Sequence, residues 1–195
     1  MPAPRAVVAL GNPGPEYDDT RHNVGFRVAD RLAELRGRSF HAKGRALRSR
    51  VSGDASEIEA WLLKPTTYMN RSGRAVRDLE EECGAWPELL VVCDDFHLPL
   101  GKLRCRTKGS AGGQKGLSSI LEVAGDRPVP RLRLGIGDPG RAPAEEFVLR
   151  PFKRGEKNDV DDMVERAALA IDAWLDDGDI EALIRRANAP TDGGA

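Results

Sequence analysis

The sequence predicts an α/β protein: a single domain with a mixed, mainly parallel twisted sheet and helices on both faces. Short, continuous apolar runs of strand length alternate along the chain with longer stretches whose apolar residues recur at helical spacing. Polar, glycine-rich turns follow the apolar runs, as they do in open α/β sheets. The 195 residues suffice for one domain with a substantial core, which we expect to span residues 1–188, with 189–195 as a flexible tail.

The first half of the chain combines buried strands, helices and a hairpin. A continuous apolar run predicts the first strand, and helical spacing that ends at Gly37 or Gly84 predicts two helices. A short turn sequence at 52–55 between two strand-like runs is typical of a hairpin. The basic residues between 40 and 50 are interpreted as solvated charges on an edge strand, with contact to a phosphate backbone as the alternative. In chain order, the predicted elements are a strand at 5–10, a helix at 22–36, strands at 46–51 and 57–63, and a helix at 72–83.

The second half continues this alternation. One buried strand leads directly into Asp94 and Asp95, and carboxylates at the end of a buried parallel strand are rarely there for packing. The apolar stripe of the long helix from residue 157 onward is interpreted as plain core packing. The predicted elements are strands at 89–93, 102–106 and 131–134, a glycine-rich loop at 109–116, and helices at 117–124, from 157 onward and at 180–187.

Composition and charge exclude several classes of protein. Thirty basic and 31 acidic residues leave a formal net charge of −1, so any surface that binds a polyanion must be a local patch. The three cysteines are an odd number and form no C-x-x-C pair, which argues against a disulfide framework or a zinc site and favours a reducing compartment. No apolar run approaches the roughly 18 residues of a membrane-spanning helix. We therefore expect a cytoplasmic protein with no membrane attachment and no metal.

The stretch that follows the first strand and runs into the first helix, residues 11–26, is the strongest candidate for a functional site. Its polar candidates are Asn12, Tyr17, His22 and Asn23. The alternative is a tight turn in which His22 merely begins a helix. In a parallel sheet, however, the loops after the strands open at the same edge, so His22 and Asp94 are expected to meet there. Asn12 and Asn70 are expected to join them.

A neutral histidine beside a carboxylate is the minimum apparatus for taking a proton from water. His22 supplies the imidazole, and Asp94 or Asp95 supplies the carboxylate. The chain has neither a G-x-S-x-G elbow nor an H-E-x-x-H metal motif, and no cysteine lies in a catalytic motif. These absences favour direct attack by water on a reactive acyl bond such as an ester. Since an asparagine amide both donates and accepts hydrogen bonds, Asn12 and Asn70 are candidates to hold the substrate carbonyl and the attacking water, respectively.

Basic side chains gather on two predicted strands near the glycine-rich loop. By alternation, the cations of each strand share one face. Each cluster taken alone fits a solvated strand face, but their combination beside one loop favours a polyanionic ligand such as a phosphate backbone. The residues concerned are Lys102, Arg104, Arg106, Arg131 and Arg133, with Lys115 in the loop.

Five sequence blocks together resemble, in the same order, the signature blocks of bacterial-type peptidyl-tRNA hydrolases. They are GNPGPEYDDTRHNVGF, KPTTYMNRSG, VVCDDFHLPLGKLR, GSAGGQKGLSSI and RLRLGIGDP, within residues 5–152. The resemblance implies a monomeric α/β enzyme of the phosphorylase/hydrolase-like type that needs no cofactor. Its implied substrate is peptidyl-tRNA, in which the enzyme cuts the ester between the peptide and the 3′ end of the tRNA.

The resemblance also implies roles for individual residues. His22 corresponds to the family's general base, and Asp94 to the acid that keeps this base in its proton-accepting form. Asn12 corresponds to the residue that distinguishes a peptide-blocked end from a free aminoacyl end. The residues implied to hold the tRNA end are Tyr17, Tyr68 and Asn70, with Met69 lining the peptide side.

The chain departs from the family pattern in two blocks. Gln114 and Lys115 stand where the family usually has a histidine and an asparagine, and His97 replaces an aspartate. Gln114 still donates and accepts hydrogen bonds, whereas Lys115 cannot accept one but is able to contact a phosphate. Both residues are expected to be neighbours of the substrate. The altered loop leaves open the alternative of an RNA-binding member of the fold that no longer cleaves.

Overall fold

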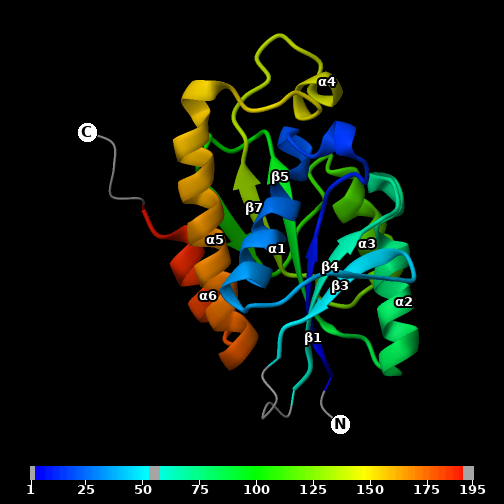
Figure 1. The fold of residues 1–195 in the computed structure, drawn as a ribbon. Coiled ribbons are helices and arrows are strands. Elements are labelled where there is room, and N and C mark those ends of the chain that lie inside the picture. Colours follow the sequence, from blue (N-terminus) through cyan, green and yellow to red (C-terminus); the bar gives the residue numbers. More distant parts are fainter. Residues whose placement is uncertain (1–2, 53–57, 191–195) are drawn as a thin grey trace.

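A mixed sheet forms the middle layer of the molecule (Figure 1). The computed structural model describes residues 3–52 and 58–190, and within them the strands are β1 (Arg5–Ala9), β2 (His41–Lys43), β3 (Ala46–Arg50), β4 (Ala60–Pro65), β5 (Glu88–Asp95), β6 (Leu103–Arg106) and β7 (Arg131–Gly135). Their order in the sheet is β2-β3-β4-β1-β5-β7-β6. The inner strands β4, β1, β5 and β7 are parallel, and β2, β3 and β6 add antiparallel pairs at the two edges. The predicted mixed, mainly parallel sheet is confirmed.

Helices cover both faces of this sheet (Figure 1). One face carries α1 (Val24–Leu35), α5 (Lys157–Asp177) and α6 (Ile180–Asn188), and the other carries α2 (Gly73–Cys83) and α3 (Lys115–Ala124). The short helix α4 (Ala144–Val148) lies beyond the tips of β5 and β7, at the top of Figure 1. The 3-10 turns are η1 (Pro15–Tyr17), η2 (Arg21–Asn23), η3 (Met69–Arg71) and η4 (Arg154–Glu156). The parallel strands therefore point their carboxyl ends at a region of loops and short helical turns.

Two apolar clusters, one on each face of the sheet, hold the layers together. Successive strand residues alternate between them, because side chains on a strand point to opposite faces. Val7 belongs to the cluster under α1, α5 and α6, whereas Val8 belongs to the cluster under α2 and α3. Trp174 of α5 is completely buried in the first cluster. The interpretation of the α5 stripe as core packing is confirmed.

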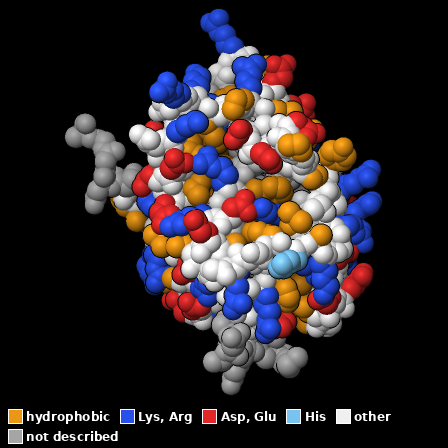
Figure 2. Space-filling view, in the orientation of Figure 1, with side chains coloured by type: hydrophobic (Ala, Val, Ile, Leu, Met, Phe, Trp, Pro, Cys, Tyr) orange, Lys and Arg blue, Asp and Glu red, His pale blue; other side chains and the backbone are white. Residues whose placement is uncertain are grey.

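Ion pairs join α1 to α5. Arg31 donates to Glu165 at 2.6 Å, and Arg36 donates to Asp172 at 2.6 Å and to Asp176 at 2.8 Å. Partly exposed pairs of this kind contribute little stability individually, but they balance charge locally. Basic and acidic side chains are accordingly interspersed over the face drawn in Figure 2, in line with the near-zero net charge.

The predicted strands and helices are present in the structure with shifted boundaries, but the prediction lacks the short edge strand β2, the 3-10 turns and one short helix. The helix expected at 22–36 begins as the turn η2 before α1, and α4 is absent from the prediction. The expectation of solvated charges between 40 and 50 is wrong for Arg48, which is buried because it pairs with Glu82 of α2 at 2.8 Å. The turn expected at 52–55 and the tail expected at 189–195 lie largely outside the described residues. Within the described part of the chain, no helix has the length and apolar character needed to cross a membrane.

Candidate active site

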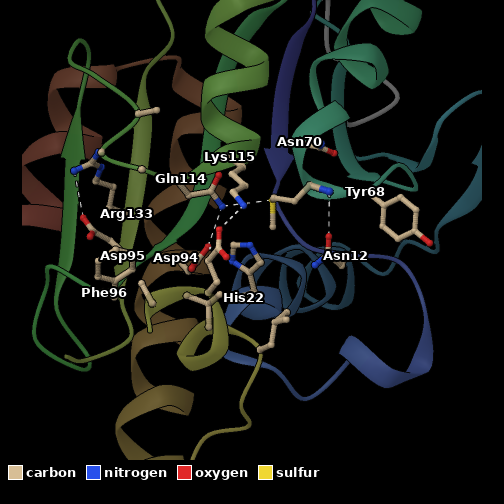
Figure 3. Close-up of a pocket in the computed structure, with 18 residues that line it drawn as sticks. Asn12, His22, Tyr68, Asn70, Asp94, Asp95, Phe96, Gln114, Lys115 and Arg133 are labelled. Carbon is tan, nitrogen blue, oxygen red and sulfur yellow. Dashed lines mark hydrogen bonds and ion pairs between the residues drawn. The ribbon is translucent and has the colours of Figure 1, made fainter. Parts of the chain in front are cut away.

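A cavity of about 420 Å³ lies at the carboxyl end of β5. Its wall comes from segments far apart in the sequence: the loop after β1, η2, η3, the loop before α3, and α4. Figure 3 shows their side chains around the cavity. The structure thus brings together the four residues that the sequence places at one edge of the sheet. The polar lining residues are Asn12, His22, Tyr68, Asn70, Asp94, Asp95, Gln114, Lys115, Arg133 and Glu145.

His22 and Asp94 form a hydrogen-bonded pair in this wall. The imidazole Nδ1 lies 2.9 Å from Oδ1 of Asp94, and the two side chains are 13% and 2% exposed. His22 reaches Asp94 because Gly25 lets α1 start close to the sheet: a Cβ there would lie 2.6 Å from the carbonyl oxygen of Leu10 and 2.9 Å from that of Val92. A carboxylate only accepts hydrogen bonds, so Nδ1 carries the proton and Nε2 keeps its lone pair. The pair is therefore arranged to accept a proton at Nε2.

Asp95 has different partners, which decides between the two carboxylates that the sequence leaves open. Its Oδ1 accepts from the backbone N–H of His97 at 2.8 Å, and its Oδ2 pairs with Arg133 at 3.2 Å. Neighbouring residues on a strand point to opposite faces, so Asp94 and Asp95 cannot both turn toward His22. Asp94 is the carboxylate that holds the imidazole.

Asn12 is held by two neighbouring segments. The buried Asn23 side chain accepts from the Asn12 backbone N–H at 2.8 Å and donates to its carbonyl oxygen at 2.9 Å. The Asn12 Oδ1 accepts from the backbone N–H of Met69 at 3.0 Å, which identifies the oxygen end of the amide. Its Nδ2 has no partner among the described residues, so Asn12 offers a donor suited to a carbonyl oxygen. Asn23, a candidate from the sequence, acts on Asn12 and does not line the cavity.

Gln114 joins the glycine-rich loop to the carboxylate. Its Oε1 accepts from the backbone N–H of Leu117 at 2.8 Å, which caps α3. Its Nε2 donates to Oδ1 of Asp94 at 3.0 Å and lies 3.5 Å from the Met69 sulfur. Gln114 therefore lines the cavity as the sequence predicts, but both ends of its amide are engaged by the protein.

A more exposed rim surrounds this polar wall. Tyr68 is 65% exposed, and Figure 3 shows it with Asn70 on the η3 side, apart from His22 and Gln114. Lys115 pairs with Glu145 of α4 at 2.6 Å, and this hydrogen bond holds the pKa of Glu145 below its usual range. The ion pair joins the start of α3 to α4 at the cavity.

The predicted cationic faces are divided between the cavity and the adjacent sheet edge. Arg133 lines the cavity, whereas Arg104 and Arg106 are exposed on β6 outside the lining. Arg104 lies opposite Arg133 in the strand register, so the two share a face of the sheet. Arg131 is buried and donates to the Gly109 carbonyl at 2.6 Å, and burial together with Arg133 lowers its pKa. The expectation that Arg131 faces a phosphate is wrong, because the glycine-rich loop covers it.

Sequence reasoning missed the wall that α4 contributes. Glu145, Val148 and Leu149 line the cavity from this side. A helix of five residues is too short to show an apolar period, but Pro143 followed by acidic residues is a helix-start signal that would have located it. Conversely, one candidate from the sequence does not line the cavity: Tyr17 lies in η1, outside the lining. Its contact with a substrate stays a prediction.

Arg21 connects the histidine segment to α4. Its buried guanidinium pairs with Glu156 at 2.6 Å and lies 4.6 Å from the ring centre of Phe147 in α4 and 4.7 Å from that of Phe152. Cation–π contacts of a desolvated guanidinium are among the stronger ones. The positions of His22 and of α4 therefore share one anchor.

The cysteines are poorly placed to act as nucleophiles. Burial raises the pKa of Cys93 well above its usual range, raises that of Cys105 to about 12, and raises that of Cys83. Since the thiolate is the reactive form, these thiols stay inert near neutral pH. Among residues 3–52 and 58–190, no three His, Cys, Asp or Glu side chains are grouped so as to hold a metal ion. Within the cavity wall, His22 and Asp94 form the hydrogen-bonded pair that is arranged to accept a proton.

The chain is similar to known proteins over nearly its whole length. The family model described as "Peptidyl-tRNA hydrolase" matches residues 6–193. The peptidyl-tRNA hydrolase of Carboxydothermus hydrogenoformans is 42% identical over 174 residues, which cover 88% of this chain and 92% of the relative. That of Aquifex aeolicus is 44% identical over 168 residues, which cover 84% of this chain and 85% of the relative. The crystal structure of peptidyl-tRNA hydrolase from Acinetobacter baumannii has a TM-score of 0.84 at 32% identity and covers 95% of each chain.

Proposed function

The chain belongs to the peptidyl-tRNA hydrolase family, and from this premise we propose that it hydrolyses the ester bond between peptide and tRNA in peptidyl-tRNA. The products are free peptide and free tRNA, as in the recycling of chains that leave the ribosome unfinished. The observation that carries the proposal is the 2.9 Å bond between His22 and Asp94 in the wall of a cavity. Function rests on such a site and not on the fold alone.

His22 is the general base in this mechanism. Asp94 holds the Nδ1–H of the imidazole. Nε2 then takes a proton from a water molecule while the oxygen of that water bonds to the ester carbonyl carbon. The carbonyl electron pair moves onto the carbonyl oxygen and returns when the bond to the ribose oxygen breaks. The imidazolium, stabilised meanwhile by Asp94, gives its proton to the leaving ribose oxygen. The imidazole ends the cycle neutral. Because water itself is the nucleophile, the mechanism needs neither a covalent acyl-enzyme intermediate nor a cofactor.

Asn12 and Asn70 position the reactants. The free Nδ2 of Asn12 donates to a substrate carbonyl, and its Oδ1 has a second lone pair beyond the one that faces the Met69 N–H. A neutral peptide amide satisfies that lone pair, whereas a free α-amino group is a cation that needs different partners, which supports selection of peptide-blocked ends. Asn70 holds the attacking water, and Met69 lines the peptide side.

The rim of the cavity and the basic sheet edge hold the tRNA in this proposal. The exposed Tyr68 ring suits stacking on an unpaired base, and the guanidinium of Arg133 suits an acceptor-stem phosphate. The proposed substrate arises in translation, and the family resemblance implies a monomer, so we propose a monomeric enzyme in the cytoplasm. The residues proposed to contact the tRNA are Tyr17, Tyr68, Asn70, Arg104, Arg106, Lys115 and Arg133.

Release of the acyl amino acid from N-acetyl-aminoacyl-tRNA by the purified protein tests the proposal. We expect turnover by the native protein and a loss of about 100-fold or more in kcat/KM for His22→Ala. The matched control is His41→Ala, since His41 is exposed on β2 outside the cavity lining. Equal rates for the native protein and His22→Ala would remove His22 from the mechanism. Binding of tRNA without release of the acyl group would instead favour the non-catalytic RNA-binding alternative.

A further inference from the structure

Two donors converge on one oxygen of the Asp94 carboxylate. Oδ1 accepts from Nδ1 of His22 at 2.9 Å and from Nε2 of Gln114 at 3.0 Å. We propose that Gln114 is a positioning residue, which fixes the rotation of the Asp94 carboxylate and thereby the orientation of the His22 ring. This inference rests on the proposed hydrolysis.

The Gln114 amide is locked with its donor toward Asp94. Its Oε1 accepts the N-cap bond of α3 from the backbone N–H of Leu117 at 2.8 Å. Rotation of the amide by a half turn would place its NH₂ group against that N–H and its oxygen against the carboxylate. Both new contacts repel, so the capping bond determines which group faces Asp94. The start of α3 is thus coupled to the orientation of the carboxylate.

A carboxylate needs such a second partner because its terminal torsion is broad. The adjacent Asp95 also has two donors, although on separate oxygens: the His97 backbone N–H bonds to its Oδ1 and Arg133 to its Oδ2. Gln114 gives Asp94 a second hydrogen-bond donor, as Arg133 does for Asp95. It does so without a charge, so Asp94 keeps its negative charge available to the imidazolium of His22.

The Gln114 amide does not titrate, so a change of pH leaves this donor in place. The ionisable groups that line the same cavity are His22, Asp94, Asp95, Lys115, Arg133 and Glu145, besides the Tyr68 phenol. Asp95 is engaged with Arg133, and Glu145 with Lys115. A histidine, which the family pattern has at this position, would add a further titrating group beside Asp94. With glutamine there, His22 is the only titrating side chain among the described residues that hydrogen-bonds to Asp94.

Two substitutions separate the positioning role from the helix cap. Gln114→Ser keeps an N-cap hydroxyl for α3 but is too short to reach Asp94. Gln114→Glu keeps both the length and the capping oxygen but sets a second carboxylate against Asp94. For both variants we expect kcat for N-acetyl-aminoacyl-tRNA to fall by about 10- to 100-fold, with KM nearly unchanged, as for other residues that orient a functional histidine through its partner. In Gln114→Glu the added negative charge favours the imidazolium, so the acid limb of the kcat/KM profile should move to higher pH.

A second measurement keeps the inference testable without activity. In ¹⁵N-labelled native protein, the Nδ1–H proton of His22 should give a resolved NMR signal, assigned by its absence from His22→Ala. That signal should be lost or shifted in Gln114→Ser while the melting temperature stays near the native value. Folded variants with native kcat, a native pH profile and an unchanged Nδ1–H signal would overturn the inference. A native protein that shows the signal but no turnover would instead refute the proposed function and leave the positioning role standing.

Discussion

Replacing Gly25 with alanine is expected to slow hydrolysis by about 100-fold through a shift of α1. The added Cβ would lie 2.6 Å from the backbone carbonyl oxygen of Leu10, the residue directly after β1, and 2.9 Å from that of Val92 in β5. Ordinary contact begins at 3.4 Å, so the first turn of α1 must move by about 0.8 Å. The bond from His22 to Asp94, now 2.9 Å, would then lengthen to about 3.7 Å, beyond hydrogen-bonding distance.

The assay compares kcat/KM and thermal unfolding of the native protein, Gly25→Ala and a matched control. Alanine gains about 1 kcal/mol of helix propensity over glycine, whereas overpacking costs about 1–3 kcal/mol, so we expect a net loss of at most about 2 kcal/mol. The control is Gly155→Ala, because a Cβ at Gly155 meets nothing within 4 Å. Native activity and stability in Gly25→Ala would refute the argument that this close approach sets the position of His22.

Three other changes test neighbouring parts of the argument. Asp94→Asn is expected to lower kcat by about 100-fold or more, because an amide no longer selects the His22 tautomer with its lone pair at Nε2; unchanged turnover would contradict that tautomer. Glu145→Gln should lower KM at low salt, because it frees the Lys115 ammonium to bind a phosphate of the substrate. The difference in KM between this variant and the native protein should vanish near about 0.5 M salt. A difference in KM that does not change with salt would contradict this expectation. Burial raises the pKa of Cys105 to about 12, so the unfolded chain ionises this thiol first. The buried, protonated Cys105 thiol therefore stabilises the fold fully below pH 9, and this stabilisation is lost as the pH rises toward 12. Melting temperatures that fall equally for the native protein and for Cys105→Ala over that pH range would refute this expectation.

Much of the fold was predictable because its strands and helices have characteristic apolar patterns along the sequence. The apolar run at 89–93 became the centre of β5, and the helical stripe from 157 onward became α5. Burial of individual cations was not predictable, because alternation assigns a face of the sheet and does not say what covers that face. Arg48 is covered by α2, where it pairs with Glu82, and Arg131 is covered by the glycine-rich loop.

The convergence of His22, Asn12 and Asp94 was predictable from the parallel sheet, whose strand ends meet at one edge. The choice between Asp94 and Asp95 was not, since both follow the same apolar run and their partners come from other segments. The bond from Gln114 to Asp94 was also hidden, because it depends on the capping of α3. Contacts that depend on where a distant helix starts carry no local sequence pattern.

The shared anchor at Arg21 makes the entrance and the proton acceptor mechanically dependent on each other. We expect a bulky nascent peptide that pushed α4 outward to strain the contact of Phe147 with the guanidinium of Arg21, the residue directly before His22. Such a displacement of α4 would shift Arg21 and, through it, the imidazole of His22. Discrimination among peptides by size would then show itself in turnover number more than in affinity.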